Sequence, residues 1–214
     1  SSAASDVYKR QAMEIAQKRW DSIAKPLHSL GKLETLLIQI AGITGNAEVD
    51  LSRRGLIAMC ADNGVVEEGV TQTGQEVTAI VAENFLKYDT SVGVMCKQNH
   101  AEIFPVDMGM VTDTKVRTDH KIAYGTQNMT KGPAMTREQA VKGLEAGIDM
   151  VRELNDKGYR ILATGEMGIG NTTTSSAVAS VLLKQPVEEM TGRGAGLTSE
   201  GLVLSLIHIS EPTR

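Results

Sequence analysis

Apolar residues along the chain alternate between short continuous runs and helical stripes. The runs Arg54 to Cys60, Ala101 to Val106 and Ile161 to Ala163 have the length and character of buried strands. Between these strands, the apolar positions of Gln75 to Lys87 and of Thr136 to Asp156 recur every three to four residues, which predicts amphipathic helices. This repeated strand–helix rhythm predicts an α/β fold, with a parallel sheet, helices on both of its faces and right-handed crossovers.

The first fifty residues follow a different pattern. Apolar positions in Ala12 to Ala24 and again after Pro26 predict two helices and no strand. We expect Ser29 to cap the second helix, and Gly42 and Gly45 to stop it. The N-terminal part is therefore predicted to be helical.

Smaller elements complete the predicted order of the chain. Ser91 to Lys97 is predicted to be another helix or a continuation of the preceding one, and His120 to Tyr124 a short edge strand. Thr136 is predicted to be the N-cap of the helix that follows it. The apolar side chains expected to face inward from the helix at Gln75 to Lys87 are Val77, Ile80, Val81 and Phe85.

Charge and composition exclude several classes of protein. The 214 residues carry a formal net charge of −4 and 3% aromatic residues, so neither a basic surface nor a stacking platform for nucleic acid is expected. No apolar run approaches the roughly 20 residues that span a bilayer. Cys60 and Cys96 lack metal-site spacing and are expected to be small core residues in a reducing, cytoplasmic compartment, and we predict no metal site.

The stretch from Tyr159 to Thr174, YRILATGEMGIGNTTT, has the composition of an anion-binding turn. A strand-like run leads into three glycines, and Asn171 and Thr172 are candidate N-caps for a helix that continues to Leu183. A strand, a glycine turn and a helix together aim backbone N–H groups and a helix dipole at an anion. The spacing alone fits an ordinary βα turn equally well, and Glu166 favours a hydroxyl or cationic partner over a phosphate.

A second glycine cluster, Gly192-Arg193-Gly194-Ala195-Gly196, also permits close approach of the backbone to a ligand. A flexible loop is the simpler interpretation of this cluster alone. The two clusters together are stronger evidence for a ligand site than either one.

The two ends of the chain resemble translated adapter sequence from sequencing libraries. They are residues 1–11, SSAASDVYKRQ, and residues 204–214, LSLIHISEPTR. We therefore expect the native segment to occupy residues 12–203 and to be a fragment. Within it we predict a helical segment of a smaller domain at 12–50 and an incomplete α/β nucleotide- and base-binding domain at 51–203.

Several stretches, in order along the chain, resemble the nicotinate-nucleotide–dimethylbenzimidazole phosphoribosyltransferase family. They are KPLHSLGKLETLLIQIAG (25–42), MCADNGVVEEGVTQTGQEVTAIVAENF (59–85), FPVDMGM (104–110), NMTKGPAMTREQA (128–140), GEMGIGNTTTSSA (165–177) and TGRGAGL (191–197).

The resemblance implies a Rossmann-like α/β domain and a defined reaction. The 5-phosphoribosyl group would pass from nicotinate mononucleotide to 5,6-dimethylbenzimidazole, giving α-ribazole 5′-phosphate and nicotinate in cobalamin lower-ligand synthesis. The resemblance also implies a homodimer, with no cofactor and no metal. The chemistry requires an anchored phosphate, two oriented flat rings and a base for the benzimidazole proton.

The resemblance also assigns candidate substrate-binding residues. The phosphate and ribose would bind at the first glycine loop and at the second, and the benzimidazole at the loop and helix after the first strand. The candidates in this chain are Glu166, Met167, Gly168, Gly170, Asn171, Thr172, Gly192, Gly194, Thr73, Gly74 and Val81. Some family members carry Ser-Pro at Thr73-Gly74, glutamine at Val81 and histidine at Asn63.

The family's catalytic glutamate would lie beyond Val203, so the resemblance assigns no catalytic residue to this chain. Loss of a general base typically costs about 10²–10⁴ in rate. We therefore expect this polypeptide to be inactive by itself. A non-catalytic phosphate- or nucleotide-binding α/β module is the alternative interpretation, and an oxidoreductase is disfavoured because G-x-G-x-x-G is absent near the first strand.

Overall fold

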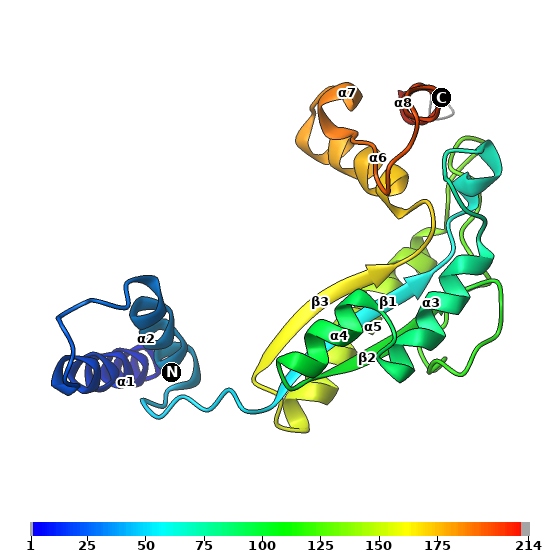
Figure 1. Ribbon diagram of the computed structural model, residues 1–214. Helices are drawn as coiled ribbons and strands as arrows, with labels where there is room; N and C mark the ends of the chain where they lie inside the picture. The colour runs from blue at the N-terminus through cyan, green and yellow to red at the C-terminus, as the bar shows by residue number, and fades with distance from the viewer. Residues whose placement is uncertain (1, 211–214) are drawn as a thin grey trace. The chain divides into compact units, whose positions relative to one another are not determined.

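The computed structural model describes residues 2–210 (Figure 1). Residue 1 and residues 211–214, which belong to the two adapter-like ends, lie outside the described residues. The chain divides into two compact units, residues 1–52 and residues 53–214. This division falls two residues from the boundary expected at 50/51.

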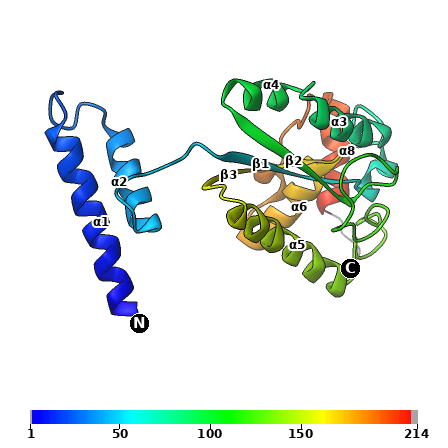
Figure 2. The ribbon, with the colours of Figure 1, turned by 90° about the horizontal axis from the view of Figure 1, so that it is seen from below.

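The N-terminal unit is a pair of antiparallel helices, α1 (Ser2–Ser22) and α2 (Lys32–Thr44) (Figure 2). Small residues form the seam between them: Ala12, Ala16 and Ala41 are buried. A Cβ added at Gly42 would come within 2.7 Å of the Met13 side chain, so glycine lets the two helices approach closely there. The prediction that this part is helical is confirmed.

Two predicted features of α2 are wrong. Gly42 does not stop the helix; it packs inside α2, and Gly45 ends it with a left-handed φ of 66°. Ser29 does not cap the helix, because its N–H closes a turn on the Pro26 carbonyl and the helix begins only after Gly31. The turn is instead held by Glu34, which accepts a hydrogen bond from the Leu30 N–H and pairs with Lys25 at 2.8 Å; Lys25 lowers the pKa of this carboxyl.

The larger unit contains a parallel sheet. Within residues 53–210, the strands β1 (Arg54–Ala61), β2 (Ala101–Gly109) and β3 (Ile161–Met167) form one sheet in the order β2-β1-β3. The helices α3 (Glu76–Lys87) and α4 (Ser91–Gln98) connect β1 to β2. The helix α5 (Arg137–Asp156) connects β2 to β3.

Helices cover both faces of this sheet, as predicted. Figure 2 shows α3 and α4 over one face and α5 over the other. Each face of the sheet has its own hydrophobic core, and alternate residues of β1 point into one or the other. Ala58 and Cys60 pack toward Phe85 of α3, whereas Ile57 packs toward Met150 of α5. The connection from β1 to β2 and the connection from β2 to β3 cross the sheet in opposite directions. Because they also lie on opposite faces of the sheet, the two crossovers have the same hand. The predicted α/β fold class is confirmed.

Both cysteines are buried and free, as expected of small core residues. Burial raises the pKa of Cys60 to about 12. A protonated thiol in this core is chemically inert.

The start of α5 follows its sequence signal. Thr136 accepts a hydrogen bond from the Gln139 N–H at 3.2 Å, and the Gln139 side-chain oxygen accepts one from the Thr136 N–H at 2.8 Å. This capping box confirms Thr136 as the N-cap.

Two other predictions in the larger unit are wrong. His120 to Tyr124 is not a strand; it touches β2 through single hydrogen bonds, such as Ile122 N–H to Met108 C=O at 3.0 Å. A turn at Thr118–Lys121 and the pairing of Lys121 with buried Asp107 at 3.1 Å keep this segment irregular. Ile80, expected to face inward, is exposed, and Thr78 and Ala79 occupy the buried face of α3.

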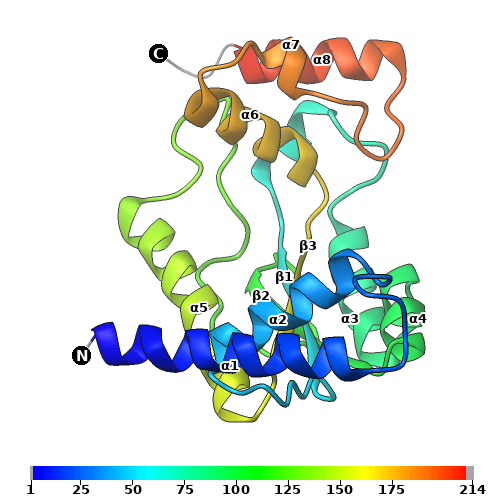
Figure 3. The same ribbon diagram turned by 90° about the vertical axis from the view of Figure 1, so that its left-hand side faces the viewer.

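Beyond the carboxyl end of the sheet lie three further helices (Figures 1 and 3). They are α6 (Asn171–Leu183), α7 (Val187–Met190) and α8 (Ser199–Ser210). Buried hydroxyls join them: Thr173 lies 3.3 Å from Ser205, and Ser176 donates to the Met190 carbonyl at 3.0 Å. None of the described helices is long and apolar enough to cross a membrane.

Candidate functional site

The carboxyl ends of β1 and β3 are adjacent, and the loops that leave them build one cavity. A 3₁₀ helix, η1 (Gly64–Glu68), and an extended loop follow β1, whereas a three-residue glycine turn follows β3 and leads into α6. Both connections start at the carboxyl ends of neighbouring parallel strands. This is the position at which open parallel sheets bind ligands.

Glycine is required in the turn after β3 because that turn lies against β1. A Cβ at Gly168 would come within 2.2 Å of the Ala61 carbonyl oxygen, which leaves no room for a side chain. Gly170 has a φ of 88° and stands at the N-cap of α6. The predicted side-chain caps, Asn171 and Thr172, are wrong: Asn171 is the first helical residue, since Gly170 already makes the left-handed bend.

The cavity between these loops has a volume of about 270 Å³. The second glycine cluster forms part of its wall, across from the first turn of α6. The lining residues are Val70, Thr71, Gln72, Thr73, Met167, Gly168, Ile169, Gly170, Asn171, Thr172, Gly194, Ala195 and Leu197.

Seven of the predicted site residues share this cavity. They come from three segments far apart in the chain: Thr73 from the loop after β1; Met167, Gly168, Gly170, Asn171 and Thr172 from the turn after β3; and Gly194 from the second cluster. Glu166 lies next to it, and its carboxylate accepts a short hydrogen bond from the Asn171 side chain.

Three predicted site residues lie elsewhere. Val81 packs against the core between α3 and the sheet. Gly74 borders the Glu76 carboxylate, and Gly192 is exposed with no atom near the position of a Cβ. The structure therefore places these three outside the wall of the cavity.

Six lining residues are not among the predicted site residues: Ile169 and Ala195, which lie within the two glycine loops, and Val70, Thr71, Gln72 and Leu197. Gln72 has a specific role, because its side-chain amide donates a short hydrogen bond to the Gly196 carbonyl and so joins the loop after β1 to the second glycine cluster. The sequence signal that could have identified Gln72 is its place in the loop after a buried parallel strand, where α/β proteins bind ligands.

The electrostatics of the cavity rest on the backbone. Among the described residues that line it, none carries an ionisable side chain. The guanidinium of nearby Arg193 is occupied by the Leu197 carbonyl at 2.9 Å and the Ser199 hydroxyl at 3.2 Å. An anion would therefore depend on N–H groups at the start of α6 and on the dipole of that helix. Partial burial raises the pKa of the neighbouring Glu166 carboxyl.

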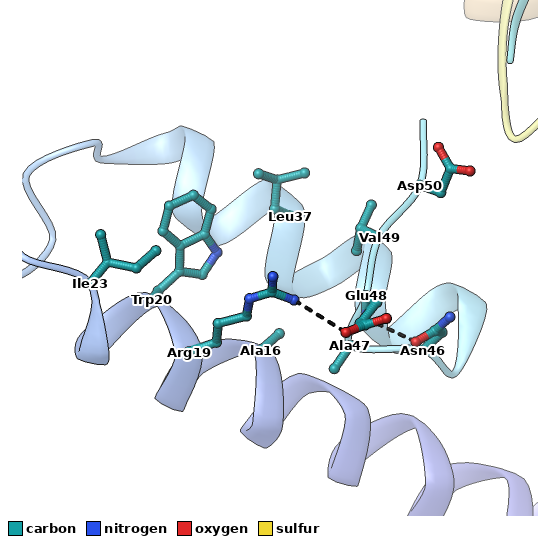
Figure 4. Close-up of a pocket in the computed structure, with 10 residues that line it drawn as sticks. All are labelled: Ala16, Arg19, Trp20, Ile23, Leu37, Asn46, Ala47, Glu48, Val49 and Asp50. Carbon is teal, nitrogen blue, oxygen red and sulfur yellow. Dashed lines mark hydrogen bonds and ion pairs between the residues drawn. The ribbon is translucent and has the colours of Figure 1, made fainter. Parts of the chain in front are cut away.

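Other hollows among the described residues have different linings. One of about 680 Å³ in the N-terminal unit is lined by Trp20, Leu37 and Val49, with Arg19 and Glu48 paired at 3.8 Å on its rim (Figure 4). It contains neither a glycine loop nor the start of a helix. A second, mostly apolar one of about 240 Å³ lies between the end of β2 and α5 and is lined in part by Met108 and Met135.

No group of three or more His, Cys, Asp and Glu side chains within residues 2–210 is arranged to hold a metal ion.

Comparison with known proteins identifies the family of the chain. The sequence model of the Phosphoribosyltransferase family matches residues 6–209. The chain therefore belongs to the phosphoribosyltransferase family, and the resemblance found in its motifs is confirmed.

Individual relatives are more specific. The chain is 50% identical over 195 residues to the nicotinate-nucleotide–dimethylbenzimidazole phosphoribosyltransferase of Ruminiclostridium cellulolyticum, covering 90% of this chain and 55% of the relative. It is 45% identical over 212 residues to the protein of the same name from Clostridium tetani, covering 94% and 59%. The crystal structure of CobT from Thermus thermophilus superposes with a TM-score of 0.85 at 34% identity, covering 94% of this chain and 61% of that one. The chain thus spans little more than half the length of these relatives.

Proposed function

We propose that this chain supplies the substrate-binding part of an enzyme that transfers phosphoribosyl from nicotinate mononucleotide to 5,6-dimethylbenzimidazole. The observation that carries the proposal is the cavity at the carboxyl end of the sheet, where two glycine loops meet the start of α6. The names of the relatives, and the family to which the chain belongs, support the choice of substrates.

The cavity suits the phosphate and ribose of a nucleotide. The phosphate would lie at the start of α6, where the helix dipole and backbone N–H groups offset its charge, although the Asn171 and Thr173 N–H groups also bond to the Gly168 and Gly170 carbonyls. The Glu166 carboxylate, beside this turn, would accept hydrogen bonds from ribose hydroxyls. A benzimidazole ring would lie against the apolar part of the wall, between Val70, Met167 and Leu197.

The reaction is a displacement at the ribose carbon C1′. A ring nitrogen of the benzimidazole attacks C1′ as the bond to the pyridinium nitrogen breaks, and the electron pair of that bond leaves with nicotinate, whose ring nitrogen becomes neutral. The proton on the other benzimidazole nitrogen must pass to a base. The lining described here holds no such base, so the residues of this chain bind and orient the two rings.

We further propose that the whole protein acts as a homodimer in the cytoplasm. Large apolar side chains are exposed on α6, where Leu182 is 75% and Val181 is 73% accessible, and such a surface favours association. The two free buried cysteines suit a reducing compartment. Light scattering of the purified protein tests the dimer.

Titration and chemical rescue test the activity. We expect the chain to bind nicotinate mononucleotide in calorimetry, and to bind nicotinate alone much more weakly because nicotinate lacks the phosphate. With both substrates present, α-ribazole 5′-phosphate should form only when imidazole is added as an external base. Binding without product at any imidazole concentration would favour the alternative, a non-catalytic phosphate- or nucleotide-binding module. Absence of nucleotide binding would refute both.

A further inference from the structure

The backbone of Ile169, in the middle of the glycine turn, is held by two side chains that come from other elements. Its N–H donates to the Thr78 hydroxyl of α3 at 3.0 Å. Its carbonyl accepts from the Asn63 side-chain amide, after β1, at 3.0 Å. The peptide groups on either side of Ile169 are therefore held in orientation by Thr78 and Asn63, which lie outside the turn.

These contacts determine where the next N–H group points. A trans peptide is planar, so the Gly170 N–H points opposite to the Ile169 carbonyl. Because Asn63 holds that carbonyl, the Gly170 N–H is turned away from Asn63. Gly170 is buried and borders the cavity, and α6 starts immediately after it.

The two side chains are themselves fixed. Thr78 is fully buried on the inner face of α3. The Asn63 side-chain oxygen accepts from the Thr174 hydroxyl at 3.3 Å, and its backbone carbonyl accepts from the Gln75 amide at 3.0 Å. Asn63 therefore joins the β1 loop, the glycine turn and the first turn of α6.

Neither side chain belongs to the lining of the cavity. Their influence on a ligand must pass through the peptide groups of the turn. The two hydrogen bonds fix the peptide planes on either side of Ile169, and with them the direction of the Gly170 N–H.

We propose that Asn63 and Thr78 are positioning residues that orient the glycine turn so that the Gly170 N–H and the start of α6 face the substrate phosphate. This inference rests on the proposed function, because it assigns the phosphate of nicotinate mononucleotide to the turn. It adds two residues that act on binding without touching the substrate.

The first test measures affinity for each substrate separately. We expect Asn63→Ala and Thr78→Val to weaken nicotinate mononucleotide binding about tenfold, which corresponds to one well-formed hydrogen bond. Binding of dimethylbenzimidazole should change less than about twofold. Thr78→Ser keeps the hydroxyl and should bind like the wild type. Asn155→Ala and Thr164→Val, which remove similar groups away from the turn, are the matched controls.

The second test needs no ligand. Hydrogen exchange of the Ile169 amide, whose N–H bonds to the Thr78 hydroxyl, should accelerate about tenfold in Thr78→Val and remain at the wild-type rate in Thr78→Ser. If the wild type binds nicotinate mononucleotide but neither variant loses affinity, the positioning role is wrong and the proposed function stands. If the wild type binds no nucleotide, the proposed function fails, and the positioning role at the phosphate fails with it. Should Thr78→Val fail to fold, Asn63→Ala and its control decide the question.

Discussion

The two glycine clusters have similar sequences and opposite environments. In the turn after β3, Gly168 and Gly170 are buried, and a side chain at either would meet backbone or core atoms. In the second cluster, Gly192 and Gly194 are exposed, and the Gly196 carbonyl is held by the single side chain of Gln72. The first cluster is packed inside the scaffold, whereas the second lies at the surface and meets the rest of the site through Gln72 and through the close approach of Gly194 to Thr172. A pattern of glycines therefore indicates that something lies close to the backbone, but it does not distinguish another segment of the protein from a ligand.

The largest expected difference between the clusters comes from adding one methyl group. Gly168→Ala places a Cβ against the Ala61 carbonyl and should lower the free energy of unfolding by about 2–3 kcal/mol, with loss of nicotinate mononucleotide binding. Gly192→Ala meets no atom within 4 Å and should change stability by less than about 0.5 kcal/mol. Urea denaturation and calorimetry measure both effects. Equal losses in the two variants would show that the clusters are equally constrained.

A second pair separates backbone strain from crowding. Gly170 and Gly196 both have positive φ, 88° and 104°, so alanine costs about 1–2 kcal/mol at either from the left-handed backbone alone. Gly170→Ala also crowds the Val66 side chain at 3.1 Å, whereas Gly196→Ala has only the Gln72 amide, at 3.6 Å. We expect Gly170→Ala to destabilise the protein more, by about 1 kcal/mol. The reverse order in thermal or urea unfolding would contradict the fixed turn.

A third variant removes a hydrogen bond of the second glycine cluster and leaves the first cluster unchanged. Gln72→Ala removes the hydrogen bond to the Gly196 carbonyl, and its cost to global stability should stay below about 1 kcal/mol because the bond is exposed. Hydrogen exchange should accelerate in residues 194–197 and remain unchanged in residues 168–170. Faster exchange in both segments would mean that the clusters move together. Gln17→Ala, which removes an exposed side-chain hydrogen bond in the other unit, serves as the control.

The smallest effect concerns Glu166 beside the fixed turn. Its pKa in the folded protein is raised above the ordinary value by burial, so its contribution to stability is full below about pH 4.5 and is lost as pH rises through the raised pKa. Glu166→Gln should therefore be slightly more stable than the wild type at pH 7, and this advantage should vanish near pH 4. Urea midpoints at the two pH values measure it. An advantage that grows on acidification would show that the carboxylate is stabilised by its neighbours.

Most of the secondary structure followed from local patterns. The strands, the helices from α3 to α6 and the capping box at Thr136 depend on residues within a few positions of each other, which sequence periodicity detects. The errors arose where a distant group overrode a local preference. Lys121 is drawn toward Asp107, so residues 120–124 do not form a strand. Gly42 looks like a helix stop but packs against Met13 of another helix.

The site was predicted in part, for the same reason. Glycines and the helix start after β3 are visible in sequence, and the resemblance to a family placed Thr73 and Gly194 near them. The roles of Gln72 and Asn63 were not visible, because their partners lie 124 and 106 residues away. Val81 was expected in the site, but it lies on α3 and packs against the hydrophobic core between that helix and the sheet.

The amino-acid sequence by itself determined the order of strands and helices, the glycine loops and the family of this chain, because these depend on short motifs and on the periodicity of apolar residues. Only the tertiary structure decided that one glycine cluster is fixed and the other exposed. That distinction depends on which segments the parallel sheet brings together: β1 and β3 are neighbours although about a hundred residues separate them, and their loops therefore share hydrogen bonds across the cavity.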